Sequence, residues 1–358
     1  MILGEAMLLK LCAENTVNNE DELDTKQKGK SLKNQNLQEA RNAGNDEFYT
    51  RMEYIESELS HYNPSDFKDK VVYCPTDAVI TTDTIAQSQF VKYFQLNVQR
   101  LQIKKLIATS LNYTGSDDVP NYYVLERTET KPVQYQEMYA QCPTDIGEIS
   151  GDYHSAFCQT LFSEADIVVT NPPFSLARDF LTLLHELGLK YIILGNVNTI
   201  TYKCIYPLIS ANKLWVGATN FNNGMYFNVP KGFQYKDTYK FKKEINGDAV
   251  NRVASVCWFT NLEHDMRNQD IVLTKQYDPA LYPKYDNCDA INVKAYKDIP
   301  KDYKGLMGVP ITFLDKYNPG QFEIVAFRKG NDGKDLYFTQ NGEKVSPYFR
   351  ILIKPKDS

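Results

Sequence analysis

The chain has 358 residues and a formal net charge of −5. This acidic balance excludes a protein that coats nucleic acid through bulk electrostatics, so any nucleic-acid site has to be a local basic patch. The length exceeds the roughly 100–200 residues of one domain, and we expect two units. Seven cysteines occur without a CxxC pair, which indicates reduced thiols rather than a disulfide framework or a structural zinc site.

The start of the chain shows no pattern of a targeting signal. It lacks a basic leader followed by a long apolar stretch and a cleavage site. No segment approaches the roughly 18 apolar residues needed to span a bilayer. Residues 14–41 are rich in Asn, Gln, Lys, Glu and Asp, a composition that predicts a mobile polar lead-in. We therefore expect a cytoplasmic protein without membrane contact, in which residues 1–44 form a mobile polar segment.

Residues 45–262 alternate short apolar stretches with amphipathic ones, a pattern typical of an α/β fold with a mostly parallel sheet. A long polar stretch at 113–150 indicates an insertion with a hairpin near 122–127. The strands predicted at 214–216 and 253–259 enclose a polar segment that is rich in aromatic residues. We predict strands at 70–74, 104–108, 166–170, 191–194, 214–216 and 253–259, and helices at 84–97, capped by Thr and Asp, and at 176–187.

Residues 263–358 differ in character from the preceding part of the chain. They contain many tyrosines, Pro-Gly turns and an alternating stretch at 321–327, which predict a mixed α+β or β-rich module. The sequence thus divides into three parts: a polar segment at 1–44, an α/β domain at 45–262 and a C-terminal module at 263–358.

Asn171, Pro172, Pro173 and Phe174 directly follow the predicted strand 166–170. Ligands of open α/β sheets bind at the carboxyl ends of strands, so this turn lies at a binding edge. Each proline lacks an N–H and has φ fixed near about −65°, which makes the turn stiff and leaves its carbonyls outside the sheet ladder. A stiff turn with two oxygen acceptors can bind the two hydrogens of a planar amine.

These residue types predict an amino-methyltransferase. The lone pair of adenine N6 is delocalised into the ring and attacks a sulfonium methyl group poorly. The side-chain oxygen of Asn171 and the carbonyl of Pro172 can each accept one N6 hydrogen and so aim the lone pair at the methyl group. Phe174 offers a face on which an extruded base can stack. The alternative is that Asn-Pro-Pro only ends a strand, as turn residues often do.

Residues 230–247 interleave lysines with aromatic rings. Five lysines minus Asp237 and Glu244 leave a local charge of +3. Lysines neutralise phosphates and aromatic rings stack on bases, so this segment is the leading candidate for DNA contact. The alternative is an exposed strand pair with solvated lysines. The lysines are Lys231, Lys236, Lys240, Lys242 and Lys243.

Several separated motifs occur in a characteristic order: NDEFYTR at 45–51, VVYC at 71–74, DIVVTNPPFS at 166–175, GN at 195–196 with TYK at 201–203, and GVPITFL at 308–314. In these motifs the chain resembles the EcoRI-type adenine-specific DNA modification methylases, from about residue 31 almost to the end. The resemblance implies a Rossmann-like sheet that binds S-adenosylmethionine, a C-terminal target-recognition module and a flipped target adenine.

The resemblance also implies residues that bind the methyl donor. A short aromatic segment closes over the donor, and its Thr hydroxyl holds the methionine end. A loop after the first strand lies beside the methionine or ribose, and an acidic residue further on accepts the adenine amine of the donor. In chain order these residues are Phe48, Tyr49 and Thr50, then Pro75, Thr76 and Asp77, then Asp152 with Tyr153. The chain departs from the common pattern because residues 74–78 contain no glycine and 108–110 lack an acidic residue.

We therefore expect a site-specific DNA adenine N6-methyltransferase that uses S-adenosylmethionine and no metal, in restriction-modification or a related form of DNA protection. We expect duplex DNA as its partner and a monomeric protein, and a cognate restriction endonuclease that acts on the same site is a further candidate partner, whose existence the sequence does not decide. Two alternatives stay open: an N-methyltransferase of RNA adenine or protein glutamine that uses the same turn, and a catalytically silent DNA-binding subunit. Sheet and turn alone do not separate these functions.

Overall fold

The computed structural model describes residues 49–77, 88–111, 121–145, 150–220, 224–229, 242–245, 248–328 and 335–356. The predicted polar segment 1–44 and four predicted site residues, Phe48, Lys231, Lys236 and Lys240, lie outside these ranges. Within them, none of the helices has the length and apolar character needed to cross a membrane. In the same ranges, no three His, Cys, Asp or Glu side chains come together in a way that could hold a metal ion.

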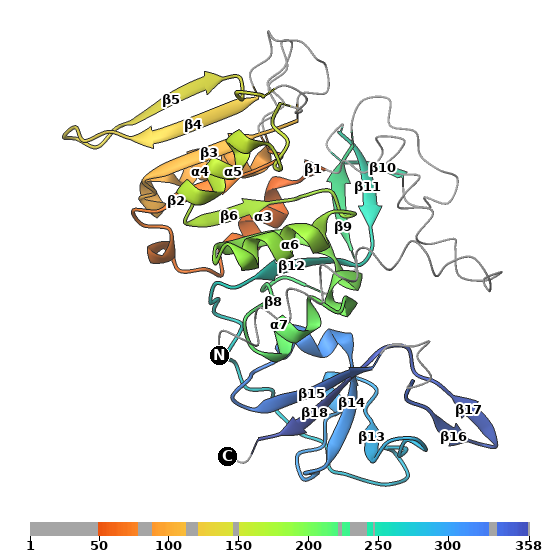
Figure 1. Cartoon of the computed structure of the whole chain (residues 1–358). Coiled ribbons are helices and arrows are strands. Elements are labelled where there is room, and N and C mark those ends of the chain that lie inside the picture. The colour runs from red at the N-terminus through yellow and green to blue at the C-terminus, as the bar shows by residue number, and fades with distance from the viewer. Residues whose placement is uncertain are drawn as a thin grey trace, which may run out of the picture.

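Among the described residues, eight strands form a central mixed sheet (Figure 1). They are β2 (Val71–Cys74), β3 (Lys105–Thr109), β4 (Tyr122–Arg127), β5 (Tyr135–Ala140), β6 (Ile167–Thr170), β7 (Lys190–Asn196), β8 (Trp215–Val216) and β12 (Val256–Thr260). Their order is β5-β4-β3-β2-β6-β7-β12-β8. The four central strands are parallel, and the outer strands pair antiparallel.

The order of the strands reverses beside β2. β3 pairs with one side of β2, and β6, which follows later in the chain, pairs with the other. Such a switch point opens a crevice at the carboxyl ends of the strands, where α/β sheets bind ligands. Residues 75–77 follow β2 and residues 171–174 follow β6, so the two predicted turns meet at this point.

Four helices cover the two faces of the central sheet: α3 (Met52–Leu59), α4 (Gln89–Leu101), α5 (Ala156–Glu164) and α6 (Ala177–Glu186). Successive strand residues point to opposite faces. Tyr73 and Val168 accordingly belong to the apolar core that includes α5 and α6, whereas Val72 and Val169 belong to the core that includes α3 and α4. Burying each large apolar side chain contributes about 1.5–3 kcal/mol, so both faces stabilise the sheet.

The predicted strands of the sheet overlap the observed ones, but helix α4 differs from its prediction. It begins at Gln89, where the Ser88 hydroxyl accepts a hydrogen bond from Phe90 N at 3.2 Å, and residues 84–87 lie outside the described ranges. It continues to Leu101 because Val98 and Leu101 extend its apolar face. Gln102 then adopts the left-handed conformation at φ 52° and ends the helix.

A second, antiparallel sheet lies beside the carboxyl end of β6 (Figure 1). It consists of β1 (Tyr49–Thr50), β9 (Met225–Asn228), β10 (Lys242–Ile245) and β11 (Asp248–Val253), in the order β1-β9-β11-β10. We call it the side sheet. It joins the start of the described chain to the segment between β8 and β12.

The C-terminal part contains a third sheet, with the order β13-β14-β18-β15, and a hairpin of β16 and β17. Ile193 of β7 and Ile353 of β18 belong to one continuous apolar core, which joins this sheet to the central one. The predicted strand 321–327 corresponds to β15. The strands are β13 (Ala290–Asn292), β14 (Leu306–Pro310), β15 (Phe322–Arg328), β16 (Phe338–Gln340), β17 (Glu343–Val345) and β18 (Arg350–Pro355).

Short helical segments complete the described fold. Helix α7 precedes β8 and contacts β15, which connects the central and the C-terminal sheets. The segments are α7 (Tyr206–Ser210) and the 3₁₀ helices η1 (Pro64–Asp66), η2 (Val197–Thr201), η3 (Tyr296–Asp298) and η4 (Ile311–Lys316).

Candidate active site

In the Asn171–Phe174 turn, one of the two proline carbonyls accepts no hydrogen bond from the residues that the structure describes. Leu176 N donates to the carbonyl of Pro173 at 2.8 Å, and this bond leads directly into α6. No described residue donates to the carbonyl of Pro172, although Pro172 itself is buried. An oxygen acceptor at the end of a buried parallel strand is thus available to a ligand amine.

Asn171 occupies the first position of the turn and is half-buried. Its Oδ1 atom lies in the interior. A half-turn of the terminal amide exchanges the oxygen and the nitrogen, and terminal amide torsions are soft. Asn171 can therefore present its oxygen to a ligand beside the Pro172 carbonyl without a change in the backbone.

Phe174 packs against Phe227 of the side sheet. Their ring centroids lie 6.0 Å apart and the ring planes meet at 81°, an edge-to-face arrangement. Phe227 is fully buried, whereas Phe174 is half-buried. The buried ring supports the exposed part of Phe174, which is the surface that a flat ligand can contact.

Strand β1 lies next to this aromatic pair. Thr50 stands opposite Phe227 and Tyr49 opposite Asn228 in the ladder with β9. Arg51 Nη1 donates to Asn228 Oδ1 at 2.9 Å and so fixes the start of α3 against β9. The structure therefore brings Tyr49 and Thr50, predicted to close over the donor, next to the residue that supports Phe174.

The Thr50 hydroxyl meets the requirement of a ligand contact. The residue is only 4% exposed, and its Oγ1 atom is buried without a hydrogen-bond partner among the described residues. Buried polar atoms in proteins are nearly always paired. A hydroxyl left open at this position fits a polar group of the methyl donor.

The loop after β2 is bound to both neighbouring strands. Asp77 N donates to Thr109 O at the end of β3, at 2.7 Å. Its carboxyl lies 2.6 Å from the Thr170 hydroxyl at the end of β6 and accepts from Ser88 at 2.7 Å. Thr76 adopts φ 67° and its hydroxyl lies 3.2 Å from that of Thr170. The predicted donor loop is thus connected to the residue immediately before Asn171.

Burial changes the pKa of the Asp77 carboxyl. Its desolvation raises the pKa of the carboxyl to about 7, and the hydrogen bonds from Thr170 and Ser88 counteract this only in part. A carboxyl with this pKa is partly protonated near neutral pH. Both of its oxygens are engaged inside the protein, which makes Asp77 a residue that positions the loop.

Asp152 and Tyr153 lie beside the carboxyl end of β3. A Cβ atom on Gly151 would stand 1.9 Å from Ser110 O, and Gly151 has φ 79°, so the loop approaches the strand closely and needs glycine there. Asp152 Oδ1 accepts from His154 N at 2.9 Å. The Tyr153 ring is buried against Phe180 at 5.2 Å. Both predicted residues therefore lie at the same edge of the sheet as Asp77.

The predicted DNA-contact segment 230–247 begins just after β9 and ends just before β11. Lys242 and Lys243 belong to β10, opposite Asn251 and Val250 of β11. The other three lysines lie outside the described residues. The segment is therefore attached to the sheet that supports Phe174.

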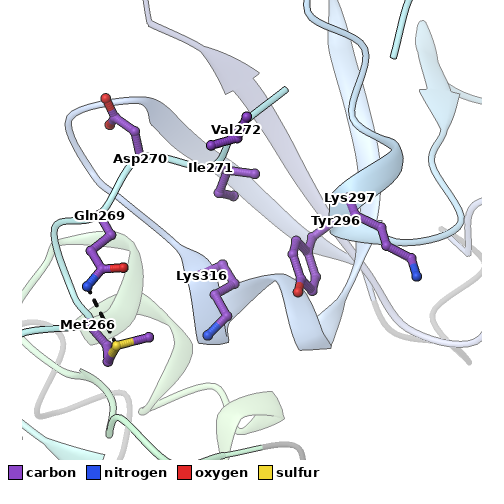
Figure 2. Close-up of a pocket in the computed structure, with 8 residues that line it drawn as sticks. All are labelled: Met266, Gln269, Asp270, Ile271, Val272, Tyr296, Lys297 and Lys316. Carbon is purple, nitrogen blue, oxygen red and sulfur yellow. Dashed lines mark hydrogen bonds between the residues drawn. The ribbon is translucent and has the colours of Figure 1, made fainter. Parts of the chain in front are cut away.

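A surface pocket lies elsewhere, in the C-terminal part of the chain (Figure 2). Its walls come from the segment after β12 and from η3 and η4, and Gln269 is hydrogen-bonded to Met266 within it. None of its residues belongs to the predicted site, and we assign it no role in methyl transfer. They are Met266, Gln269, Asp270, Ile271, Val272, Tyr296, Lys297 and Lys316.

Two residues of the site were not identified from the sequence. Phe227 lies in an alternating stretch, MYFN at 225–228, that could have indicated a strand, but no pattern shows that it meets Phe174. The sequence places Thr170 in a strand but does not show its contact with Asp77, because the two residues lie 93 positions apart. Both contacts depend on tertiary structure.

Comparison with known proteins agrees with this geometry. Residues 36–356 match the family described as adenine-specific methyltransferase EcoRI. The Type II methyltransferase M.EcoRI of Escherichia coli is 42% identical over 332 residues, which cover 90% of this chain and 97% of the relative. Type II methyltransferase M.MpnI of Mycoplasma pneumoniae is 36% identical over 80% of this chain and 83% of its own length.

A third relative, Type II methyltransferase M.MgeORF184P of Mycoplasma genitalium, is 35% identical over 88% of this chain and 97% of its own. No solved structure gives a significant match. The family match extends from before the side sheet to the end of the C-terminal sheet, and each of the three relatives covers at least 80% of the chain. The chain is an enzyme that belongs to the EcoRI family of adenine-specific methyltransferases.

Proposed function

We propose that this enzyme transfers a methyl group from S-adenosylmethionine to N6 of an adenine that is flipped out of duplex DNA. The observation that supports this most directly is the Pro172 carbonyl beside Asn171, to which no described residue donates. It lies at the switch point of the sheet and next to the Phe174–Phe227 pair. The relatives are named Type II methyltransferases, which favours a role in restriction-modification.

Asn171 and Pro172 act on the amine. Their two oxygens accept the two N6 hydrogens, which favours a nitrogen whose lone pair points out of the ring plane. S-adenosylmethionine supplies an electrophilic methyl group when bound. The N6 lone pair forms the new N–C bond while the C–S bond breaks and its electron pair stays on sulfur, and N6 releases one proton to solvent. Positioning and electrostatics supply the rate, without a covalent enzyme intermediate.

The residues around the turn fit the methyl donor. Thr50 has a buried hydroxyl with no partner among the described residues, which suits the methionine end. The loop of Pro75, Thr76 and Asp77 borders the switch point, and Asp152 with Tyr153 lies at the end of β3, the side on which we place the adenine of the donor. Phe48 and Tyr49 complete this proposed donor site.

We also propose which part of the chain carries out catalysis and which part recognises DNA. Residues 45–262 form the Rossmann-like catalytic domain, and residues 263–358 form the module that recognises the target sequence. Lys231, Lys236, Lys240, Lys242 and Lys243 contact DNA phosphates near the flipped base, since their segment is attached to the side sheet. Two further predictions are that the enzyme is a monomer and that a cognate endonuclease acts on the same site.

The test is methyl transfer by the purified protein. Labelled S-adenosylmethionine is supplied with unmethylated duplex DNA, structured RNA or a protein extract, and the products are resolved by nucleoside and amino-acid analysis. The proposal expects N6-methyladenine in DNA alone. Label only in RNA adenine or in protein glutamine would replace the proposed substrate, and donor binding without transfer to any of the three would indicate a silent subunit.

A further inference from the structure

Three side chains form a row across the side sheet. Phe227 of β9 stands directly opposite Thr50 of β1 on one side and Asn251 of β11 on the other. Directly opposed residues of antiparallel strands point to the same face, with Cβ atoms about 4.5–5.5 Å apart. Asn251 therefore lies beside the ring that supports Phe174.

The Asn251 side chain is buried and has no hydrogen-bond partner in the described part of the chain. The residue is 1% exposed, and neither Nδ2 nor Oδ1 has a hydrogen-bond partner among the described residues. Other buried Asn residues of the chain are paired: Asn220 donates to Gly217 O at 2.6 Å and accepts from Trp258 N at 2.7 Å. A purely structural Asn would have such partners, so the open amide of Asn251 indicates a ligand.

The position of Asn251 favours the base over the methyl donor as that ligand. Thr50, which we assign to the donor, lies on the opposite side of Phe227. Asn251 lies on the side of β10, directly opposite Lys242 of the proposed DNA-contact segment. DNA that enters along these lysines would bring its flipped base to the Asn251 side of the aromatic pair.

The chemistry of adenine selects the atom that Asn251 uses. In the proposed function both N6 hydrogens are already bound by Asn171 and Pro172. The other polar atoms of the base, N1, N3 and N7, are acceptors without hydrogens. Of the two open atoms of Asn251, only Nδ2 can donate to them.

We propose that Asn251 binds the flipped adenine, with its side-chain Nδ2 donating a hydrogen bond to a ring nitrogen of the base held against Phe174. This inference rests on the proposed function and names a further binding residue of the same site. Its effect is on base binding and alignment, because Asn251 contacts neither the methyl group nor N6.

The test combines variants of the enzyme with variants of the base. The target site is first obtained by sequencing DNA that the wild-type enzyme has methylated. Duplexes then contain adenine, 1-deazaadenine, 3-deazaadenine or 7-deazaadenine at the target, and each is methylated under single-turnover conditions by the wild type and by Asn251→Ala. We expect one deaza base to slow the wild type about tenfold and to slow Asn251→Ala no further.

This pairwise comparison distinguishes a failure of the proposed function from a failure of the role of Asn251. No methylation of adenine in DNA by the wild type refutes the proposed function itself. Methylation by the wild type with no deaza penalty, or with the same penalty in Asn251→Ala, overturns the role of Asn251 and leaves the proposed function intact.

A second variant separates binding from folding. Asn251→Leu keeps the side-chain size and removes an unpartnered buried amide, so its melting temperature should equal or exceed that of the wild type. Donor affinity by calorimetry should stay within twofold while methyl transfer falls at least tenfold. Asn63→Ala, at an exposed turn before the amino end of β2, is the matched control and should retain the wild-type rate. Wild-type transfer by Asn251→Leu contradicts the proposal.

Discussion

Thr170 and Asp77 share a hydrogen bond that joins the strand end before the Asn171–Phe174 turn to the proposed donor loop. The Thr170 hydroxyl lies 2.6 Å from Asp77 Oδ2 and 2.5 Å from Pro75 O. A hydroxyl has one proton and can donate to only one of these oxygens. When Asp77 is ionised, the hydroxyl donates either to the carboxylate or to Pro75 O. When Asp77 is protonated, its carboxyl can donate to Thr170 while Thr170 donates to Pro75, so that both contacts are hydrogen bonds. The raised pKa of Asp77, about 7, agrees with this arrangement.

This pair predicts how stability depends on pH. The pKa of Asp77 is about 7 in the folded chain and 3.8 in a solvated carboxyl, so the folded state binds more protons between these values. The contribution of Asp77 to stability should therefore decrease as pH rises from about 4 to 7, by on the order of 4 kcal/mol. Asp77→Asn, whose amide donates to Thr170 at every pH, should remove this slope. Denaturant unfolding of both proteins at several pH values measures it.

Asp69→Asn is the control for this experiment. Asp69 forms an exposed ion pair with Arg127, and its loss should leave the slope between pH 4 and pH 7 in place. Equal slopes for the wild type and Asp77→Asn would show that Asp77 is ionised across this range.

The Thr50 hydroxyl should contribute to binding of the methyl donor. Thr50→Val keeps the side-chain shape and removes a buried hydroxyl that has no partner among the described residues. We expect roughly tenfold weaker binding of S-adenosylmethionine by calorimetry, the usual size of one hydrogen bond to a charged group. Thr128→Val, in the turn between β4 and β5, is the control. Unchanged affinity in Thr50→Val would exclude this contact.

The lysine segment should determine the salt dependence of DNA binding. Each lysine that neutralises a phosphate contributes about 0.9 to the slope of log affinity against log salt. Each lysine of the segment should contribute in this way, and replacing it by alanine should reduce the slope by up to that amount, while Lys131→Ala should leave the slope unchanged. The variants are single alanine replacements of Lys231, Lys236, Lys240, Lys242 and Lys243. Fluorescence anisotropy with a duplex at several salt concentrations provides the slopes. An unchanged slope in all five variants would place the phosphate contacts elsewhere.

Glu58 should be required for stable packing of α3 against the residues that follow β8. Its carboxylate is fully buried in α3 and accepts hydrogen bonds from Tyr62, Ala218 and Thr219. Glu58→Ala leaves these donors without a partner and should lower the free energy of unfolding by roughly 3 kcal/mol. The exposed Glu56→Ala on the same helix should change it by less than about 0.5 kcal/mol. Similar stabilities of the two variants in denaturant titrations would contradict this role.

The central sheet could be predicted because its signals are local. Apolar runs such as 166–170 and 70–74 are bounded by turn residues, and the Asn-Pro-Pro-Phe turn directly follows one of them. The start of α4 could not be located so well, since Thr84 and Ser88 are both acceptable caps. Element boundaries depend on such small differences.

The surroundings of the turn could not be predicted from the sequence. Phe227 and Asn251 come from strands formed more than 50 residues after Phe174, and their meeting depends on the pairing of β1, β9 and β11. The buried state of Asp77, which raises its pKa, likewise follows from packing and not from its neighbours in the chain.

The most direct test of the central claim is nucleoside analysis of duplex DNA methylated by the wild type, Asn171→Ala and Asn171→Asp. Asp retains an oxygen acceptor at the amine, whereas Ala has none. We expect N6-methyladenine from the wild type, a rate lower by a factor of about 10²–10³ for Asn171→Ala, and a smaller loss for Asn171→Asp, with donor binding preserved in both. Wild-type turnover by Asn171→Ala, or a product other than N6-methyladenine, would contradict the proposed function.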